Sequence, residues 1–179
     1  MRDSLIAQIE RDFAGVSREG GVSISEAYAI DDYEPEEVRA AARLADTYSR
    51  WNGIDIAKED PAGSALSFFD SIGFRFHLPA YMCFKLRHGH QCLGSHIDSN
   101  ALMSEFHLRI ENDHVRQKLS LLSASQRRCV ARFLVFEAYA SELENLGGDY
   151  LRVLRADWLR HLPSGEQKRL QARWPQLRR

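Results

Sequence analysis

Four residues of different chemical types lie close together near the middle of the chain: Asp70, Arg75, His77 and Tyr81. An imidazole can act as a general base, a carboxylate can orient it, and a guanidinium can stabilise an anion. Such a set could line a small-molecule pocket or the active site of an enzyme. The alternative is structural, with Asp70 holding a turn, Arg75 paired with an acid and the ring of Tyr81 buried. We favour the structural interpretation, because no nucleophile elbow, phosphate loop or paired-carboxylate signature accompanies these residues.

A second group, His88, His90, Cys92 and His96, offers nitrogen and sulfur ligands within one short segment. A zinc ion could be held by such side chains. Their spacing matches no established ligand pattern, however, and a single loop would have to supply every corner of a tetrahedron. We therefore favour a solvated, histidine-rich loop, and predict no metal or other cofactor.

The three cysteines, Cys83, Cys92 and Cys129, are widely spaced. This spacing argues against a disulfide framework and fits a reducing compartment. Cys83 and Cys129 lie among apolar residues, where a free cysteine usually acts as a small buried hydrophobe rather than a nucleophile. Residues 1–13 lack the apolar run of a signal peptide, and no stretch of about 18 apolar residues occurs anywhere. We expect a cytoplasmic protein that does not associate with a membrane.

Charge is distributed unevenly along the chain. Residues 1–70 hold 15 acidic and 7 basic side chains, whereas residues 71–179 hold 10 acidic and 17 basic ones. Neutralisation between the two halves is the simplest use of this asymmetry. Several of the acids gather beside an aromatic residue in one segment: Asp31, Asp32, Tyr33, Glu34, Glu36 and Glu37. These charges could simply start a helix, but they also suit the binding of a partner protein with a basic surface.

The last thirty residues are rich in arginine and also contain Trp158 and Trp174. Phosphate contacts and base stacking would use these residue types. Trp158, however, shares a helical face with Leu151, Leu154 and Leu162, which predicts that its ring is buried. The sequence pI of about 6.7 is also far below that of a typical nucleic-acid binder. We therefore do not expect nucleic acid as a partner.

Most of the chain has helical periodicity. Leu5, Ile9 and Phe13 predict a first helix, and Pro35 followed by two glutamates predicts the start of another. That second helix has an apolar face of Val38, Ala41, Ala42, Ala45, Tyr48 and Trp51. Ser123 and Gln126 have the spacing of a capping box before a long helix that ends at Gly147-Gly148, and Ser164 with Gln167 repeats that spacing.

The segment around residues 72–78 is the exception. Phe74, Phe76 and Leu78 alternate with Arg75 and His77, which is the period of a half-buried strand. In such a strand, Arg75 and His77 would share one face. Pro79 then follows at a position where it could open a helix. The predicted fold class is mainly α (α+β), a single compact multi-helix domain with one short strand or hairpin near residues 72–78.

Three segments together resemble an uncharacterised bacterial family known as a domain of unknown function. They are Ala65–Asp70, Gly73–Met82 and Leu119–Ser123, and the similarity continues to Gln126, Val130, Phe133 and Leu134. It covers about residues 5–136. The resemblance implies no catalytic residue, substrate or cofactor. It predicts a family-like globular core over residues 1–148 and a basic helical extension over residues 149–179, packed on the same domain.

Taken together, these observations predict a non-catalytic cytoplasmic protein–protein interaction module, of an immunity-like or regulatory kind. Its expected binding surface is the acidic segment Asp31–Glu34. The alternative is a small-molecule-binding protein or enzyme with a pocket formed by Asp70, Arg75, His77 and Tyr81.

Overall fold

A computed structural model describes residues 1–89, 102, 105–106, 113–142 and 148–178 of the chain. Within these ranges the secondary structure is helical, and none of the described residues forms a strand. The mainly α prediction is therefore confirmed. The described residues divide into two compact units, one drawn from residues 13–89, 102, 105–106 and 113–121 and the other from residues 1–12, 122–142 and 148–178. The predicted division at residue 148 stays a prediction.

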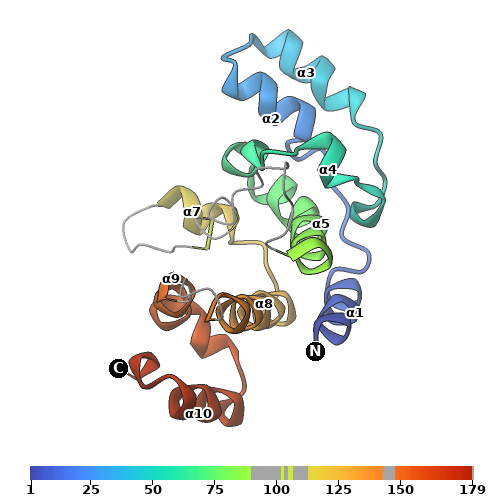
Figure 1. Cartoon of the computed structure of the whole chain (residues 1–179). Helices are drawn as coiled ribbons and strands as arrows, with labels where there is room; N and C mark the ends of the chain where they lie inside the picture. Colours follow the sequence, from blue (N-terminus) through green and yellow to red (C-terminus); the bar gives the residue numbers. More distant parts are fainter. Residues whose placement is uncertain (90–101, 103–104, 107–112, 143–147, 179) are drawn as a thin grey trace. The chain divides into compact units, whose positions relative to one another are not determined.

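The first unit contains a helical hairpin and the long helix α5 (Figure 1). Its elements are α2 (Ile24–Asp31), α3 (Glu36–Ala45), the 3₁₀ turn η1 (Trp51–Gly53), α4 (Ile56–Glu59), the 3₁₀ turn η2 (Ser64–Phe68), α5 (Ser71–His88) and α7 (Asp113–Lys118). Helix α5 carries the buried centre of this unit. Phe74, Phe76, Leu78 and Met82 are each at most 1% exposed, so burial of apolar surface holds this helix in place.

The predicted strand at residues 72–78 is wrong, because these residues belong to α5. Asp70 begins the helix, since its side-chain oxygen accepts a hydrogen bond from the backbone N–H of Gly73 at 2.7 Å. Helix α5 is buried on nearly all sides, so its sequence lacks the polar stripe that would reveal a 3.6-residue period. The short alternation of apolar and polar residues was therefore misleading, because His77 is as buried as its apolar neighbours.

Pro79 lies inside α5 and does not open it. A proline in a helix interior removes one backbone hydrogen bond and costs about 3 kcal/mol. Burial of the surrounding side chains offsets this cost, because the residues from Phe76 to Cys83 are all buried. Tertiary packing thus decides the local structure here, against the local preference of proline.

Two glycines allow the chain before α2 to approach the start of α5 closely. A methyl group on Gly73 would overlap the carbonyl oxygen of Val22 and lie 2.9 Å from Oδ1 of Asp70. A methyl group on Gly21 would lie 2.5 Å from the backbone nitrogen of Gly73. The backbone N–H of Val22 also donates to Oδ1 of Asp70 at 3.0 Å. Asp70 therefore joins two segments that are far apart in sequence.

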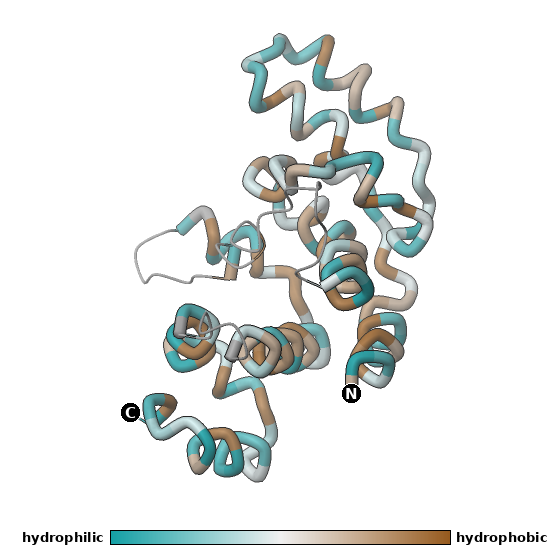
Figure 2. Tube along the Cα trace, viewed as in Figure 1, coloured by the Kyte–Doolittle hydropathy of each residue, from teal (hydrophilic) through white to brown (hydrophobic). Residues whose placement is uncertain are grey.

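The second unit is built around α8 (Ala124–Glu142). Its other elements are α1 (Arg2–Asp12), α9 (Gly148–Val153), the π-helical turn η4 (Leu154–Trp158), the 3₁₀ turn η5 (Leu159–His161), α10 (Ser164–Arg173) and the 3₁₀ turn η6 (Pro175–Leu177). Helix α1 packs on α8, and α9 and η4 also contact α8. In Figure 2 hydrophobic residues recur along α8 and α1.

The capping box predicted for α8 is confirmed. The backbone N–H of Gln126 donates to Oγ of Ser123 at 3.2 Å, and the N–H of Ser123 donates to Oε1 of Gln126 at 3.0 Å. The corresponding prediction at Ser164 is wrong, because Pro163 is the N-cap of α10 and makes no side-chain capping bond. The side chain of Gln167 instead donates to the carbonyl of Leu162 at 2.7 Å.

Candidate functional site

The turn between α2 and α3 presents the acidic segment to solvent. Asp31, Asp32 and Tyr33 are exposed, and the side chain of Tyr33 is 91% exposed. The turn is fixed by two backbone hydrogen bonds, from Tyr33 to Ile30 at 3.1 Å and from Glu34 to Ala29 at 2.9 Å. Tyr33 has a φ of 56°, in the left-handed region that non-glycine residues seldom adopt. An exposed aromatic residue is thus held in a costly conformation at the end of the hairpin.

An ion pair between a partly exposed arginine and a buried glutamate ties α3 to α2. Nε of Arg43 donates to Oε2 of Glu26 at 2.8 Å, and Nη2 of Arg43 donates to the other carboxylate oxygen. Glu26 is only 2% exposed and also completes a capping box with Ser23. The hydrogen bonds that Arg43 donates to this carboxylate raise the pKa of Arg43 above its usual value. Truncating Arg43 would leave a buried carboxylate without its partner.

Opposite faces of α3 differ in chemical character. Glu36, Arg39 and Arg43 follow one another at helical spacing, and Arg39 donates to the carbonyl of Glu34 at 2.5 Å. No residue of α3 is buried. Four of its apolar residues are exposed, Val38, Ala41, Leu44 and Ala45, with Val38 at 43% and Leu44 at 79%, whereas Ala40 and Ala42 are partly covered. The hairpin is therefore joined by polar contacts of Arg39 and Arg43 and leaves four apolar side chains of α3 in solvent.

The four residues that the alternative hypothesis assigns to a pocket, Asp70, Arg75, His77 and Tyr81, make different contacts in the first unit. Asp70 caps α5, and Tyr81 donates from its hydroxyl to Oδ2 of Asp60 at 2.5 Å. Arg75 is two residues before His77, which places the two side chains on opposite sides of a helix. The predicted shared strand face of Arg75 and His77 is therefore wrong. Nε of Arg75 is buried and makes no hydrogen bond within the described part of the chain.

His77 is 1% exposed and packs against Phe69, with the two rings parallel and their centroids 4.4 Å apart. Its Nδ1 lies 2.7 Å from the carbonyl oxygen of Gly73. Because a carbonyl can only accept, Nδ1 carries the proton. Burial lowers the pKa of His77 to about 4, with a smaller opposite effect from this hydrogen bond. The imidazole is thus neutral at neutral pH and is enclosed by its own fold.

Asp60 is the central polar residue of this unit, and the sequence analysis did not single it out. It is fully buried, and its carboxylate accepts from the hydroxyls of Tyr28 and Tyr81 at 2.6 and 2.5 Å. The backbone N–H groups of Ser64 and Ala65 also donate to it, at 3.0 and 3.3 Å. Burial raises the pKa of Tyr81 well above its usual value. The signal available in the sequence was Asp60-Pro61 shortly before Gly63, a turn pattern in which aspartate often bonds backbone N–H groups.

A second buried charge pair was also missed. Nζ of Lys118 lies 2.6 Å from Oε2 of Glu105 and donates to the carbonyls of Leu66 and Ser67. Both charged side chains are less than a tenth exposed. The lysine joins α7 to η2, and its hydrogen bonds satisfy the buried charge.

Comparison with family models shows which protein family the chain belongs to. A model of a family of unknown function matches residues 1–162. The chain belongs to this family, DUF6714. A search of curated proteins and a search of solved structures each found no match. The predicted family resemblance is therefore confirmed, and the DUF6714 match extends it at both ends.

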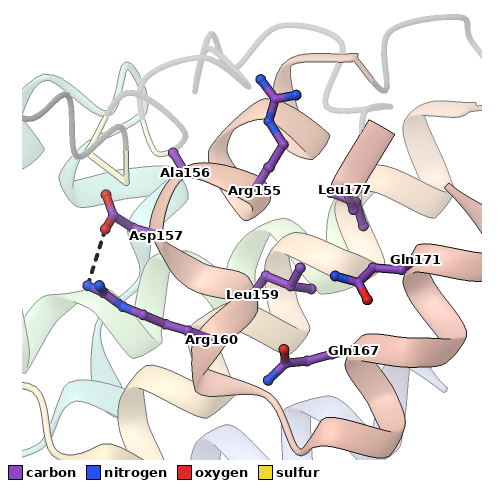
Figure 3. Close-up of a pocket in the computed structure, with 8 residues that line it drawn as sticks. All are labelled: Arg155, Ala156, Asp157, Leu159, Arg160, Gln167, Gln171 and Leu177. Atoms are coloured by element: carbon purple, nitrogen blue, oxygen red, sulfur yellow. Dashed lines mark ion pairs between the residues drawn. The ribbon is translucent and has the colours of Figure 1, made fainter. Parts of the chain in front are cut away.

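The DUF6714 match includes the whole α2–α3 hairpin and α5, but it ends before α10. A hollow of about 300 Å³ lies at this boundary, between η4 and α10 (Figure 3). It is lined by Arg155, Ala156, Asp157, Leu159, Arg160, Gln167, Gln171 and Leu177. Arg160 turns toward Asp157 and pairs with it at 3.2 Å, which partly neutralises the positive charge here.

Both tryptophans of the second unit are buried. Trp158 is fully buried, as predicted, and Trp174 is 3% exposed. Neither ring is therefore presented for stacking on a nucleic-acid base. Cys83 and Cys129 are also buried, at 1% and 0% exposure, as expected of small hydrophobes.

Of the residues considered as candidate metal ligands, His90, Cys92 and His96 lie outside the described residues, and only His88 is within them. Across the described ranges, no group of histidine, cysteine and carboxylate side chains is arranged to hold a metal ion. The helices of those ranges also include none with the length and apolar character that a membrane crossing requires.

Proposed function

We propose that the chain is a non-catalytic bacterial cytoplasmic protein of the immunity or regulatory kind, which binds a partner protein with a basic surface. The binding surface is the end of the α2–α3 hairpin, formed by Asp31, Asp32, Tyr33 and Glu34.

One observation carries this proposal. Between residues 24 and 46, the charged residues that are exposed to solvent are all acidic: Asp31, Asp32, Glu36 and Glu37. Both arginines of the same segment are partly covered and bond to groups of the hairpin itself. The surface therefore has a single sign of charge, which steers a basic partner toward it and repels acidic ones.

Tyr33 adds an aromatic anchor to this surface. Tyrosine is enriched among the residues that contribute most to protein–protein binding. Its left-handed backbone at φ 56° costs stability that glycine would not lose. A costly conformation that displays an exposed aromatic side chain is more easily understood if that side chain binds something.

The catalytic alternative has less support in the geometry. His77 and Tyr81 are each 1% exposed, and their polar atoms bond to Gly73 and Asp60. A substrate would have to displace these contacts. We therefore retain the interaction module as the proposed function, and the enzyme stays a hypothesis.

The test combines a charge reversal with a matched control. Asp31→Lys/Asp32→Lys should weaken capture of protein partners from the native cytoplasm, while Asp3→Lys/Asp55→Lys makes the same charge change at other exposed positions. Thermal unfolding should be nearly unchanged, because lysine at the C-terminal end of α2 complements the helix dipole. Equal capture by both variants and the wild type would overturn the proposal.

Tyr33→Gly separates binding from folding. Glycine tolerates a positive φ, so the variant should be as stable as the wild type or more stable by up to about 1 kcal/mol. Loss of the aromatic ring should weaken partner binding by about tenfold or more. A variant that gains stability and loses binding would show that the tyrosine serves the partner and not the fold.

A further inference from the structure

The outward face of α3 is apolar, and the described residues leave it uncovered. Val38, Ala41 and Ala45 follow helical spacing, and all three are exposed. They are offset by two positions from Glu36, Arg39 and Arg43, which places the two sets on opposite sides of the helix. Leu44, at 79% exposure, extends the apolar surface along one edge. We call Val38, Ala41, Leu44 and Ala45 the α3 face.

The inward side of α3 is the charged one. Arg43 bonds Glu26 of α2, and Arg39 bonds the carbonyl that follows the hairpin turn. A surface helix normally buries its apolar side and exposes its charges. Helix α3 instead leaves four apolar residues exposed, Val38, Ala41, Leu44 and Ala45, and only Ala40 and Ala42 are partly covered. Exposed apolar surface of this kind marks a site of association.

The occupant must be apolar along its length and basic at one end. The acids Asp31, Asp32, Glu36 and Glu37 all lie at the hairpin turn or in the first turn of α3, so the negative charge borders one end of the α3 face. Ala41 in the middle of the face and Ala45 at its end allow another backbone to approach closely, as in helix pairs with small interaxial distances. Ten residues give α3 a length of about 15 Å, which matches three turns of a second helix.

We infer that the α3 face binds an amphipathic α-helix of the partner, with the basic residues of that helix lying over the acidic end of the hairpin. This inference rests on the proposed function and specifies its partner. A second copy of the chain fits less well, because an antiparallel pair of α3 helices would place each acidic end beside Leu44 and Ala45. No exposed basic side chain of residues 24–46 is available there to neutralise it.

The probe is a fluorescently labelled peptide of about 18 residues, long enough to form a helix on binding. It carries Leu and Ala at i, i+3, i+4 and i+7 spacing and Lys elsewhere. A second peptide has the same composition in an order without an apolar face. Fluorescence anisotropy on the full chain should show binding of the amphipathic peptide at least about tenfold tighter than the scrambled one. Equal affinities would mean that charge alone attracts the peptide, and would overturn the inference.

Neutral substitutions then locate the contact. Ala41→Gln/Ala45→Gln should weaken binding of the amphipathic peptide by about tenfold. The control variant Ala57→Gln/Ala172→Gln changes exposed helical alanines elsewhere and should leave the affinity for the peptide unchanged. Glutamine is a good helix former, so α3 should persist in the variant, which circular dichroism can verify.

The Asp31→Lys/Asp32→Lys variant, measured with the same peptide, distinguishes the two proposals. If the charge reversal weakens binding and the glutamine variant does not, the acidic turn binds without the α3 face, and only this inference is overturned. If neither variant weakens binding, the proposal that the acidic surface binds the partner is overturned as well. If the protein alone sediments as a dimer that the glutamine variant dissociates, a second copy occupies the α3 face and the inference is wrong.

Discussion

Replacing Asp60 with asparagine tests how the first unit is held together. Each carboxylate oxygen of Asp60 accepts from one tyrosine hydroxyl and one backbone N–H. Asparagine keeps the shape but replaces one oxygen by an NH₂ group, which cannot accept. The tyrosine hydroxyl on that side can rotate and accept instead, but the backbone N–H of Ser64 or Ala65 cannot. One buried N–H therefore loses its partner in either orientation of the amide.

The expected cost follows from these contacts. Losing a hydrogen bond to a charged acceptor and leaving a buried donor unsatisfied each cost about 1–3 kcal/mol. We expect Asp60→Asn to lower the free energy of unfolding by about 3 kcal/mol. Tyr81→Phe removes one hydroxyl and leaves the other three donors, so its cost should be about 1–2 kcal/mol. Tyr28 is less buried than Tyr81, and Tyr28→Phe should cost less again.

Urea denaturation followed by circular dichroism measures these differences as shifts in the midpoint at constant slope. Tyr48→Phe is the matched control, because Tyr48 bonds Glu59 near the surface and that bond raises the pKa of its hydroxyl to about 12. Removing this hydroxyl should cost less than about 0.5 kcal/mol. If Asp60→Asn unfolds at the wild-type midpoint, or if Tyr48→Phe costs as much as Tyr81→Phe, the buried network does not stabilise the fold as described.

Two further predictions concern α5. Gly73→Ala should lower the free energy of unfolding by about 2 kcal/mol or more, because its methyl group would overlap Val22; Gly53→Ala, with open space around it, should be close to neutral in the same denaturation assay. His77 has a folded pKa of about 4, below its unfolded value of about 6.5, so the unfolded state binds more protons between these values and stability falls as pH falls. Between pH 7.5 and 5.5 the free energy of unfolding of the wild type should fall by about 1.3 kcal/mol more than that of His77→Gln. Equal decreases in the two proteins would show that this imidazole is not the titrating group.

The sequence was most informative where a local signal and the tertiary structure agree. The capping box at Ser123 and Gln126 fixes the start of α8, and the burial of Trp158 follows from its position on a leucine-rich face. At α5 the same approach failed, because a helix buried on nearly all sides has no polar stripe to show its period. The interior position of Pro79 depends on contacts that no local pattern contains.

The polar interior could not be predicted for a related reason. Asp60, Tyr28 and Tyr81 come from three separate segments, and only the fold brings their side chains within hydrogen-bond distance. The same holds for Lys118 and Glu105. Sequence reasoning grouped Tyr81 with His77 and Arg75 because they are neighbours along the chain. In the structure, Tyr81 bonds Asp60, which is distant in sequence, and His77 bonds the backbone carbonyl of Gly73.

Helix α3 shows what an amphipathic pattern does and does not determine. The sequence correctly indicates that Val38, Ala41 and Ala45 share one face. Tyr48 and Trp51 were predicted on the same helical face, but they lie beyond the end of α3 at Ala45. The pattern also does not indicate what covers that face. Its alanine, glutamate and arginine residues have high helix propensity, so α3 needs little packing to persist. The Arg43–Glu26 pair supplies the attachment to α2 and turns the apolar side outward. A helix attached through its charges keeps its apolar surface available for another chain, and this arrangement is what a binding element requires.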